Sequence, residues 1–212
     1  MSQTKPTIAV ADYGIGNLGS LVNALEHLGA DVVVTSEGQT LLAAEGMILP
    51  GNGAFGASKK AMERLSIPRW VGQRVAGGRP VLGICVGHQY LFDASEEFGK
   101  YDGMGEWPGT VKKLATEAVP HIGWSEVHPA ADTVLFAGLG EERYYFSHSY
   151  AVLEWEFDQS IESMVPPQVS WGYHDGDFIA AVENGPLVGV QFHPELSGRA
   201  GLTVLQNWMG SF

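Results

Sequence analysis

The chain has 212 residues, of which 24 are acidic and 12 are basic, so its formal net charge at pH 7 is −12. Phosphate backbones are repelled by such a charge, and no nucleic-acid binding is expected. No apolar run reaches the length of a membrane span, and the first residues, MSQTKPTIAV, lack the apolar region of a signal peptide. We therefore expect a cytoplasmic protein with no membrane association, and the 45% apolar content predicts a single globular domain over residues 1–212.

Strand and helix patterns alternate through the first half of the chain. Apolar runs predict strands, the second of them buried, at residues 8–11, 31–36, 46–51 and 80–84. Apolar residues at helical spacing predict helices at residues 18–28, 54–65 and 67–78, with Gly29 ending the first. This order predicts an α/β fold in three layers, with a mostly parallel open sheet and helices on both faces.

The second half contains shorter strand patterns separated by Gly and Pro. Residues 109–114, 125–129 and 143–153 are predicted to extend the same sheet in antiparallel fashion. Asn184 and Gly185 predict a hairpin turn, which is followed by a last strand and a closing helix.

The stretch DYGIGNLGS contains Gly14, Gly16 and Gly19 in the spacing G-x-G-x-x-G, directly after a predicted strand. That spacing occurs in dinucleotide-binding turns, and Glu37 stands where an acidic residue could bind ribose. A non-catalytic dinucleotide-binding or regulatory module is therefore one hypothesis. Because so short a match is weak evidence, we favour tight turn geometry as the reason for the glycines.

Cys85 is the only cysteine, and it stands between Gly83 and Gly87 in the stretch VLGICVGHQ. A strand runs directly into the cysteine and a helix-compatible segment follows, which is typical of a nucleophile elbow. The start of a helix favours the thiolate form of the sulfur. The backbone N–H of Val86 could then help to hold an oxyanion.

His193, in the stretch GVQFHPEL, is the best candidate for the base that a nucleophilic cysteine needs. Glu195 lies two residues further, on the same side of an extended segment, and could orient the imidazole. The pattern predicts a triad of Cys85, His193 and Glu195, with His148 as the rival base. With one cysteine and no histidines at ligand spacing, neither a metal site nor a cofactor is expected.

The stretches PGNGAF, GICVGHQ and QFHPE, in this order, resemble the class I, triad-type glutamine amidotransferases. The stretches DYGIGNLGS, PHIGWSEV and YYFSHSY resemble one branch of that family, the glutaminase subunits of imidazole glycerol phosphate synthase. The resemblance covers residues 12–208 and implies the flavodoxin-like fold of that family. It also implies hydrolysis of glutamine to glutamate and ammonia through a thioester on Cys85.

The resemblance further implies roles for residues around the triad. It implies an oxyanion site formed by Gly53 together with Val86. The positions that match those holding glutamine in the family are Gln89, Glu97, His148, Ser149 and Tyr150.

The family passes ammonia directly to a partner, so the resemblance implies a heterodimer with a (β/α)8-barrel cyclase subunit. Asn17 and Trp124 are expected at that interface. Four positions depart from the branch pattern, namely Asn52, His88, Ser125 and Leu196. The alternative within the same chemistry is a glutaminase that serves another synthase or hydrolyses another γ-glutamyl compound.

Overall fold

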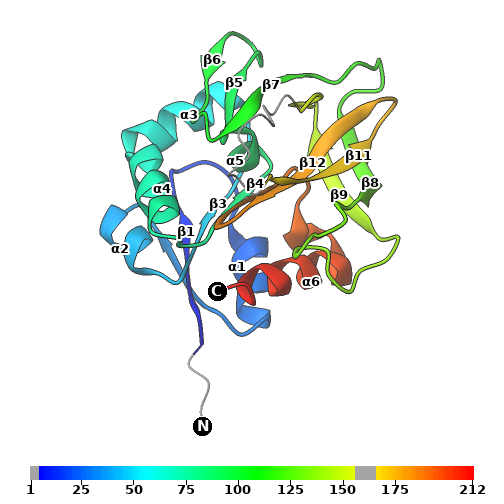
Figure 1. Ribbon diagram of the computed structural model, residues 1–212. Helices are drawn as coiled ribbons and strands as arrows, with labels where there is room; N and C mark the ends of the chain where they lie inside the picture. Colours follow the sequence, from blue (N-terminus) through cyan, green and yellow to red (C-terminus); the bar gives the residue numbers. More distant parts are fainter. Residues whose placement is uncertain (1–4, 156–165) are drawn as a thin grey trace.

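The computed structural model describes residues 5–155 and 166–212 (Figure 1). The parallel strands of its large sheet are β1 (Thr7–Ala11), β2 (Asp31–Thr35), β3 (Gly46–Leu49), β4 (Val81–Ile84) and β13 (Leu187–Val190). The antiparallel strands of the same sheet are β8 (His121–His128), β9 (Arg143–His148), β11 (Gln168–Tyr173) and β12 (Asp177–Asn184). Within the described residues this nine-stranded sheet has the order β2-β1-β3-β4-β13-β12-β11-β8-β9. The predicted mostly parallel sheet with an antiparallel extension is confirmed.

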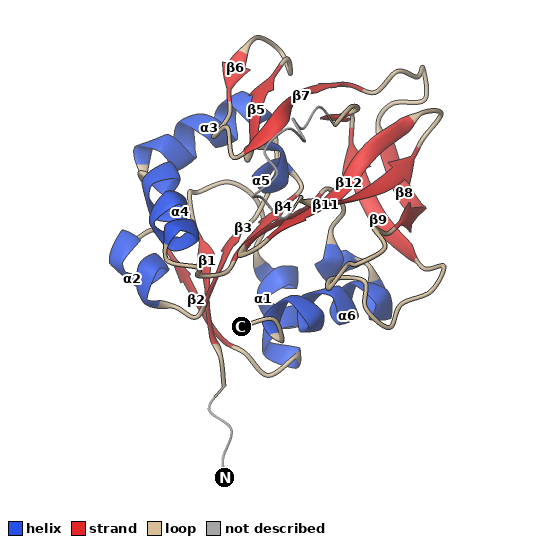
Figure 2. Ribbon diagram, in the orientation of Figure 1, coloured by secondary structure: helices blue, strands red, loops and turns tan. Residues whose placement is uncertain are grey.

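Helices cover both faces of the sheet (Figure 2). One face carries α1 (Gly19–His27) and α6 (Gly198–Met209), and the other carries α2 (Gly38–Ala43), α3 (Phe55–Arg64) and α4 (Ile67–Ala76). Two short elements follow the central strands: α5 (Val86–Gln89) after β4, and the 3-10 turn η1 (Pro194–Leu196) after β13. The three predicted layers are therefore present.

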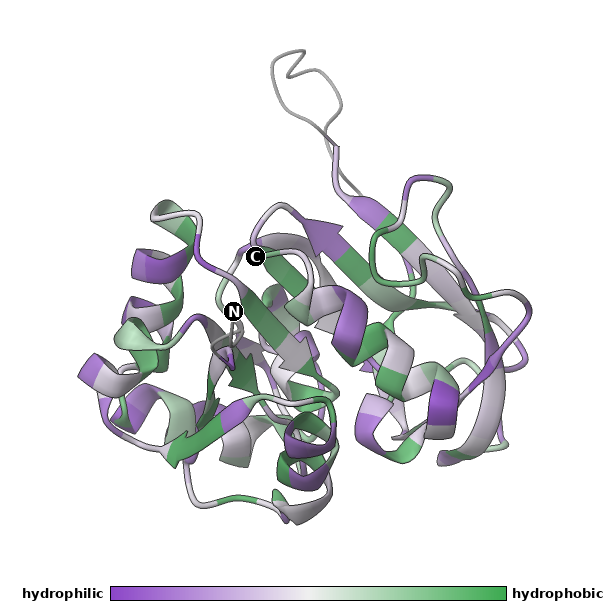
Figure 3. Cartoon of the chain, turned by 90° about the horizontal axis from the view of Figure 1, so that it is seen from below, coloured by the Kyte–Doolittle hydropathy of each residue, from purple (hydrophilic) through white to green (hydrophobic). Residues whose placement is uncertain are grey.

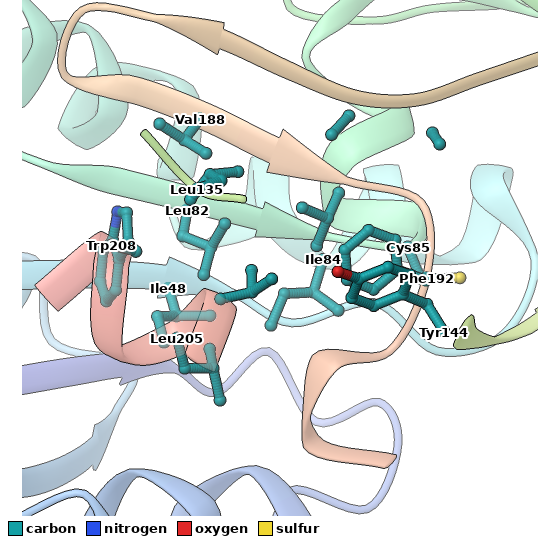
Figure 4. Packing of buried hydrophobic residues seen from close by; sticks show 14 of the residues in the cluster. Ile48, Leu82, Ile84, Cys85, Leu135, Tyr144, Val188, Phe192, Leu205 and Trp208 are labelled. Atoms are coloured by element: carbon teal, nitrogen blue, oxygen red, sulfur yellow. The ribbon is translucent and has the colours of Figure 1, made fainter. Parts of the chain in front are cut away.

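Alternating side chains of the strands build a separate core on each face. Ile8 and Val10 of β1 pack with α1 and α6, whereas Ala9 and Ala11 pack with α2, α3 and α4. Hydrophobic segments accordingly concentrate in the middle of the molecule (Figure 3). The first core runs along the strands and ends at Cys85 (Figure 4), so the sulfur lies at the boundary between packed core and site.

A buried guanidinium joins α4 to the chain between α2 and β3. Arg74 is fully buried, and its Nη1 donates to the carbonyl oxygens of Leu41 and Ala44 at 2.9 and 2.8 Å. Its Nη2 donates to the carbonyls of Glu45 and Pro80 at 2.8 and 2.9 Å. Burial, and secondarily the charge of Arg79, lowers the pKa of Arg74 to about 10. Carbonyls at the end of a short helix thus receive the donors that they would otherwise lack.

Three predictions about strands were wrong. Residues 109–114, and residues 150–152 at the end of the predicted strand 143–153, belong to a second, four-stranded sheet of order β10-β7-β5-β6 and not to the large one. Its strands are β5 (Phe92–Ser95), β6 (Tyr101–Asp102), β7 (Trp107–Lys113) and β10 (Tyr150–Val152). The strand predicted as buried at residues 31–36 is β2, which forms an edge of the large sheet, and none of its residues is fully buried.

None of the helices in the described parts of the chain is both long enough and apolar enough to cross a membrane.

Candidate active site

Cys85 occupies a strained turn between β4 and α5. Its backbone φ is +52° and its ψ is −110°, a conformation that L-residues rarely adopt. The Cys85 N–H donates to the carbonyl of Val190 at 2.8 Å, which ties the turn to β13. The strand, turn and helix therefore form the predicted elbow, with the cysteine at its tip.

Glycines allow other chain segments to approach this elbow closely. A β-carbon on Gly87 would lie 2.1 Å from the carbonyl oxygen of Leu49, and one on Gly83 would lie 2.8 Å from that of Gly87. A β-carbon on Gly51 would lie 2.2 Å from Val86 N. Any larger residue at these positions would displace backbone, which explains the small residues flanking the cysteine.

His193 contacts both of its predicted triad partners. Its Nδ1 lies 2.9 Å from Glu195 Oε1, and the Cys85 side chain is near enough to act on the pKa of the ring. Burial alone would lower the pKa of His193, but Cys85 and Glu195 outweigh burial and raise it to about 10. The geometry therefore favours an imidazolium beside the sulfur.

A small cavity of about 140 Å³ opens beside Cys85, and both predicted oxyanion residues, Gly53 and Val86, lie on its wall. The predicted substrate residues also line it, namely Gln89, Glu97, His148, Ser149 and Tyr150. Pockets for drug-sized ligands typically measure about 300–1,000 Å³, so this one suits a small polar molecule.

Glu97 and Gln89 are each fixed by a hydrogen bond at the cavity wall. Glu97 Oε2 accepts from the N–H of Phe55, the first residue of α3, at 2.7 Å. A carboxylate at that position is favoured by the positive end of the helix dipole. Gln89 Nε2 donates to the carbonyl of Tyr150 at 2.8 Å.

His148 belongs to a histidine cluster that no sequence pattern indicated. Its Nδ1 lies 3.0 Å from the Tyr150 carbonyl and must donate to it, so its Nε2 accepts from His121 Nδ1 at 3.0 Å. His121 Nε2 then accepts from the Ser125 hydroxyl at 2.8 Å. Burial lowers the pKa of His148 to about 3 and that of His121 to about 4, with the stacked His174 as a second cause for His121. A neutral His148 that donates to a carbonyl is poorly suited to act as the base.

Gln191 contacts the sulfur and was missed by the sequence analysis. Its Nε2 lies 3.6 Å from Cys85 Sγ, and its side chain is completely buried. Its position beside the sulfur follows from the pairing of β13 with β4, which no local pattern in the sequence indicates.

A second cavity, of about 290 Å³, adjoins the first. His193, Asn52 and Ser147 line both cavities, and Asn17 lines only the second. Asn17 is exposed, and its Oδ1 accepts from the N–H of Gly19 at 2.9 Å. The second cavity thus connects the surroundings of the imidazole with the surface around Asn17.

Trp124 packs near Tyr145, which lines the second cavity. It is 52% exposed on β8, and its ring stands 6.1 Å from that of Tyr145, a residue of the cavity wall. The two predicted interface residues, Asn17 and Trp124, are therefore both near Tyr145. An exposed tryptophan beside a cavity suits a protein contact.

The glycine turn leaves little space for a dinucleotide. Gly14 and Gly16 have φ values of +78° and +88°, as tight turns require. A β-carbon on Gly16 would lie 2.4 Å from Asn52 Nδ2, so the Asn52 side chain covers the backbone that a pyrophosphate would approach. The turn packs against the loop containing Gly53.

Among residues 5–155 and 166–212, no group of three or more His, Cys, Asp or Glu side chains is arranged to hold a metal ion.

Comparison with known families assigns this arrangement to a class of enzymes. The family described as "Glutamine amidotransferase class-I" matches residues 9–210. The chain belongs to this family and is a glutamine amidotransferase, as the resemblance predicted.

Individual relatives within this family share a more specific name. The chain is 51% identical over 206 residues to "Imidazole glycerol phosphate synthase subunit HisH" of Renibacterium salmoninarum, a match that covers 97% of this chain and 94% of the relative. It is 50% identical over 205 residues to the protein of the same name from Corynebacterium diphtheriae, with 95% and 97% covered.

Solved structures agree on the fold. The structure of PurLQS from Thermotoga maritima aligns with a TM-score of 0.73 at 21% identity, covering 98% of this chain and 99% of that one. A structure described as a glutamine amidotransferase aligns with a TM-score of 0.71 at 18% identity, covering 96% and 97%.

Proposed function

We propose that this chain is the glutaminase subunit of an imidazole glycerol phosphate synthase and works in histidine biosynthesis in the cytoplasm, as a single domain. The observation that carries the chemistry is the contact of His193 with both Cys85 and Glu195 at the edge of a small polar cavity. The near-full-length identity to HisH subunits supports the biosynthetic role.

In this proposal Cys85 is the nucleophile and His193 transfers protons. The sulfur, whose proton already resides on His193, attacks the side-chain carbonyl carbon of glutamine, so that a C–S bond forms and the carbonyl oxygen becomes an oxyanion. The C–N bond then breaks and His193 protonates the leaving nitrogen, which departs as ammonia. Water, deprotonated by His193, cleaves the thioester to glutamate and regenerates the cysteine. Glu195 holds the imidazole in the orientation that both steps require.

Backbone and side-chain groups around the cavity would hold the substrate. The N–H groups of Gly53 and Val86 would stabilise the oxyanion of the tetrahedral intermediates. Glu97 has the charge needed to bind the α-ammonium group of glutamine. The segment from His148 to Tyr150 would line the path of the side chain.

We propose a (β/α)8-barrel cyclase as the partner, docked on the surface that carries Asn17 and Trp124. Ammonia is mostly protonated in water at neutral pH, so direct transfer preserves the nucleophilic form. The second cavity supports this direction of transfer, because it lies between His193 and the exposed Asn17.

The test measures glutamate release from glutamine with and without the barrel subunit and its ligand. We expect Cys85→Ala to lower the stimulated rate by roughly three or more powers of ten. A Cys85→Ala protein that still released glutamate at the rate of the unaltered enzyme would overturn the assigned nucleophile. His27→Ala, on the exposed side of α1, is the control and should retain full activity.

A second candidate is a glutaminase for another synthase, favoured by His88, Asn52 and Ser125, which depart from the branch pattern. Mixing the protein separately with different synthase subunits would distinguish the two. The partner that accelerates glutamine hydrolysis identifies the acceptor.

A further inference from the structure

A chain of hydrogen bonds reaches Cys85 from the Tyr150 carbonyl through Gln89 and Gln191. Gln89 Nε2 donates to the Tyr150 carbonyl at 2.8 Å and to Gln191 Oε1 at 3.0 Å. Gln191 Nε2 in turn lies 3.6 Å from Cys85 Sγ. Gln191 is completely buried and Gln89 nearly so, so water does not compete for these bonds.

The orientation of both amides follows from the backbone carbonyl at one end. A carbonyl can only accept, so the Gln89 atom that faces Tyr150 must be its nitrogen. The two hydrogens of that nitrogen serve the Tyr150 carbonyl and Gln191, so the Gln191 atom that faces Gln89 must be its oxygen. The remaining terminal atom of Gln191, which faces the sulfur, is therefore an N–H donor.

Strand pairing determines the position of this donor. Val190 of β13 pairs with Ile84 of β4 in parallel register, so Gln191 follows directly beside Cys85. The Gln191 N–H donates to Ala180 at 2.8 Å and anchors the residue to β12. The donor thus stands directly after β13, and its backbone is tied to β12.

A donor at this position acts selectively on the charged sulfur. Hydrogen bonds to an ionised acceptor are roughly twice as strong as those between neutral groups. A neutral amide donor stabilises an anionic acceptor without adding a competing charge. The raised pKa of His193 keeps that ring cationic beside the same sulfur, and the cation and the amide donor together would stabilise the anion.

We infer that Gln191 is a further catalytic residue, which stabilises the Cys85 thiolate through its Nε2–H and is positioned by Gln89 and the Tyr150 carbonyl. The inference rests on the proposed role of Cys85 as nucleophile. The donor acts at the first and the last step of the reaction. It stabilises the sulfur anion before the C–S bond forms, and again when hydrolysis breaks that bond and the electron pair returns to sulfur.

The experiment measures alkylation of Cys85 by iodoacetamide at pH 7 in the free protein, followed by mass spectrometry. The single cysteine makes the labelled site unambiguous. Gln191→Glu keeps the oxygen that accepts from Gln89 but replaces the donor by an acceptor. Gln191→Met keeps the length and removes both polar groups. We expect roughly tenfold slower alkylation in Gln191→Glu and roughly threefold slower alkylation in Gln191→Met.

Gln73→Glu, an exposed change on α4, is the matched control for added charge and should react at the unaltered rate. Thermal unfolding checks that each variant is folded, and Gln191→Met decides the question should Gln191→Glu fail to fold. Alkylation of folded Gln191→Met at the unaltered rate overturns the inference. An unaltered protein whose Cys85 reacts no faster than free glutathione contradicts instead the proposed nucleophile.

A second readout uses the complex with the barrel subunit. We expect kcat for glutamine hydrolysis to fall in Gln191→Met while KM stays within about twofold, because the donor acts on sulfur and not on bound glutamine. A change confined to KM contradicts the inference.

Discussion

The side chain of Asn52 lies directly over the backbone of Gly16, so that a β-carbon at residue 16 would fall 2.4 Å from Asn52 Nδ2 and 2.6 Å from Asn52 Cβ. The two residues come from different turns, one after β1 and one after β3. Asn52 also lines both cavities. Asn52 therefore links the exposed glycine turn to the residues around the site.

We predict that Gly16→Ala lowers glutamine hydrolysis by roughly ten- to hundredfold, because displacing Asn52 shifts the turn that contains Gly53. Gly14→Ala is the control for backbone strain. It also has a positive φ, but its β-carbon would meet nothing within 4 Å. Both variants carry the strain of a β-carbon at positive φ, which costs about 1–2 kcal/mol, but only Gly16→Ala clashes with Asn52. Glutamate release and urea unfolding, measured on both variants, distinguish the two effects.

Removing the Asn52 side chain provides a rescue experiment. We expect Asn52→Gly combined with Gly16→Ala to recover activity relative to Gly16→Ala alone. Equal activities of Gly14→Ala and Gly16→Ala would show that the contact does not matter.

The raised pKa of His193 predicts how the stability of the protein changes at alkaline pH. The pKa of His193 is raised to about 10, above the about 6.5 of an unfolded histidine. Its contribution to stability is therefore complete below pH 6.5 and is lost as the pH rises to about 10. We expect the NMR titration of the His193 ring to have its midpoint near 10 and to move to lower pH in Cys85→Ala.

The same variant should change the pH dependence of unfolding. Because Cys85 contributes to the raised pKa, the loss of stability between pH 6.5 and 10 should be smaller in Cys85→Ala. A His193 midpoint that is identical with and without the sulfur would contradict the pairing.

His88 gives a prediction on the acidic side. It is buried beside Trp107 and Phe92, and burial, followed by the charge of His148, lowers its pKa to about 3. The unfolded chain binds a proton near pH 6.5 that the folded chain resists, so stability contributed by the neutral ring is lost as the pH falls from about 6.5 toward 3.

We predict that His88→Met reduces the slope of unfolding free energy against pH by about 1.4 kcal/mol per pH unit between pH 4 and 5.5. Urea unfolding at several pH values measures the slope. His27→Met, an exposed change on α1, should leave it unaltered. The same slope in His88→Met and the unaltered protein would mean that His88 takes up a proton in the folded state.

Arg74 gives a prediction of stability alone. Arg74→Met removes a guanidinium that bonds the carbonyls of Leu41, Ala44, Glu45 and Pro80, and it leaves those oxygens without their donors. We expect urea unfolding to show a loss of about 3–5 kcal/mol.

Arg74→Lys should lose nearly as much, because a single ammonium cannot span both pairs of carbonyls. Arg64→Met, an exposed change in α3, is the matched control. A loss below about 1 kcal/mol in Arg74→Met, the size expected of a surface pair, would show that the bonds contribute little.

Sequence patterns predicted helices, strands and turns correctly where these depend on residues close together in the sequence. The strand over Ile8 and Ala11, the helix ended by Gly29 and the turn at Cys85 all depend on residues close in sequence. The contact between His193 and Glu195 is also local, but it forms across the start of the 3-10 turn η1 and not along an extended segment as the pattern suggested.

The wrong predictions concern relationships between distant segments. Three valines at 32–34 have the pattern of a buried strand, but β2 pairs on one side only and is therefore half exposed. The strand β7 pairs with β5 and β10, and nothing in its own residues distinguishes this sheet from the larger one.

The same limit explains the missed site residues. Gln191 and Gln89 lie 102 positions apart, and their meeting depends on the pairing of β13 with β4. Likewise, His121 and His148 meet because they are paired across β8 and β9.

The imidazole of His193 forms part of the wall between the two cavities, and this location would separate the fates of the two products. Glutamate, the larger, would have to leave by the entrance through which glutamine came. Ammonia is small enough to continue past the ring toward the opposite exit. The release of glutamate and the release of ammonia would then be independent. Blocking the second cavity would prevent ammonia from reaching a partner without slowing the release of glutamate.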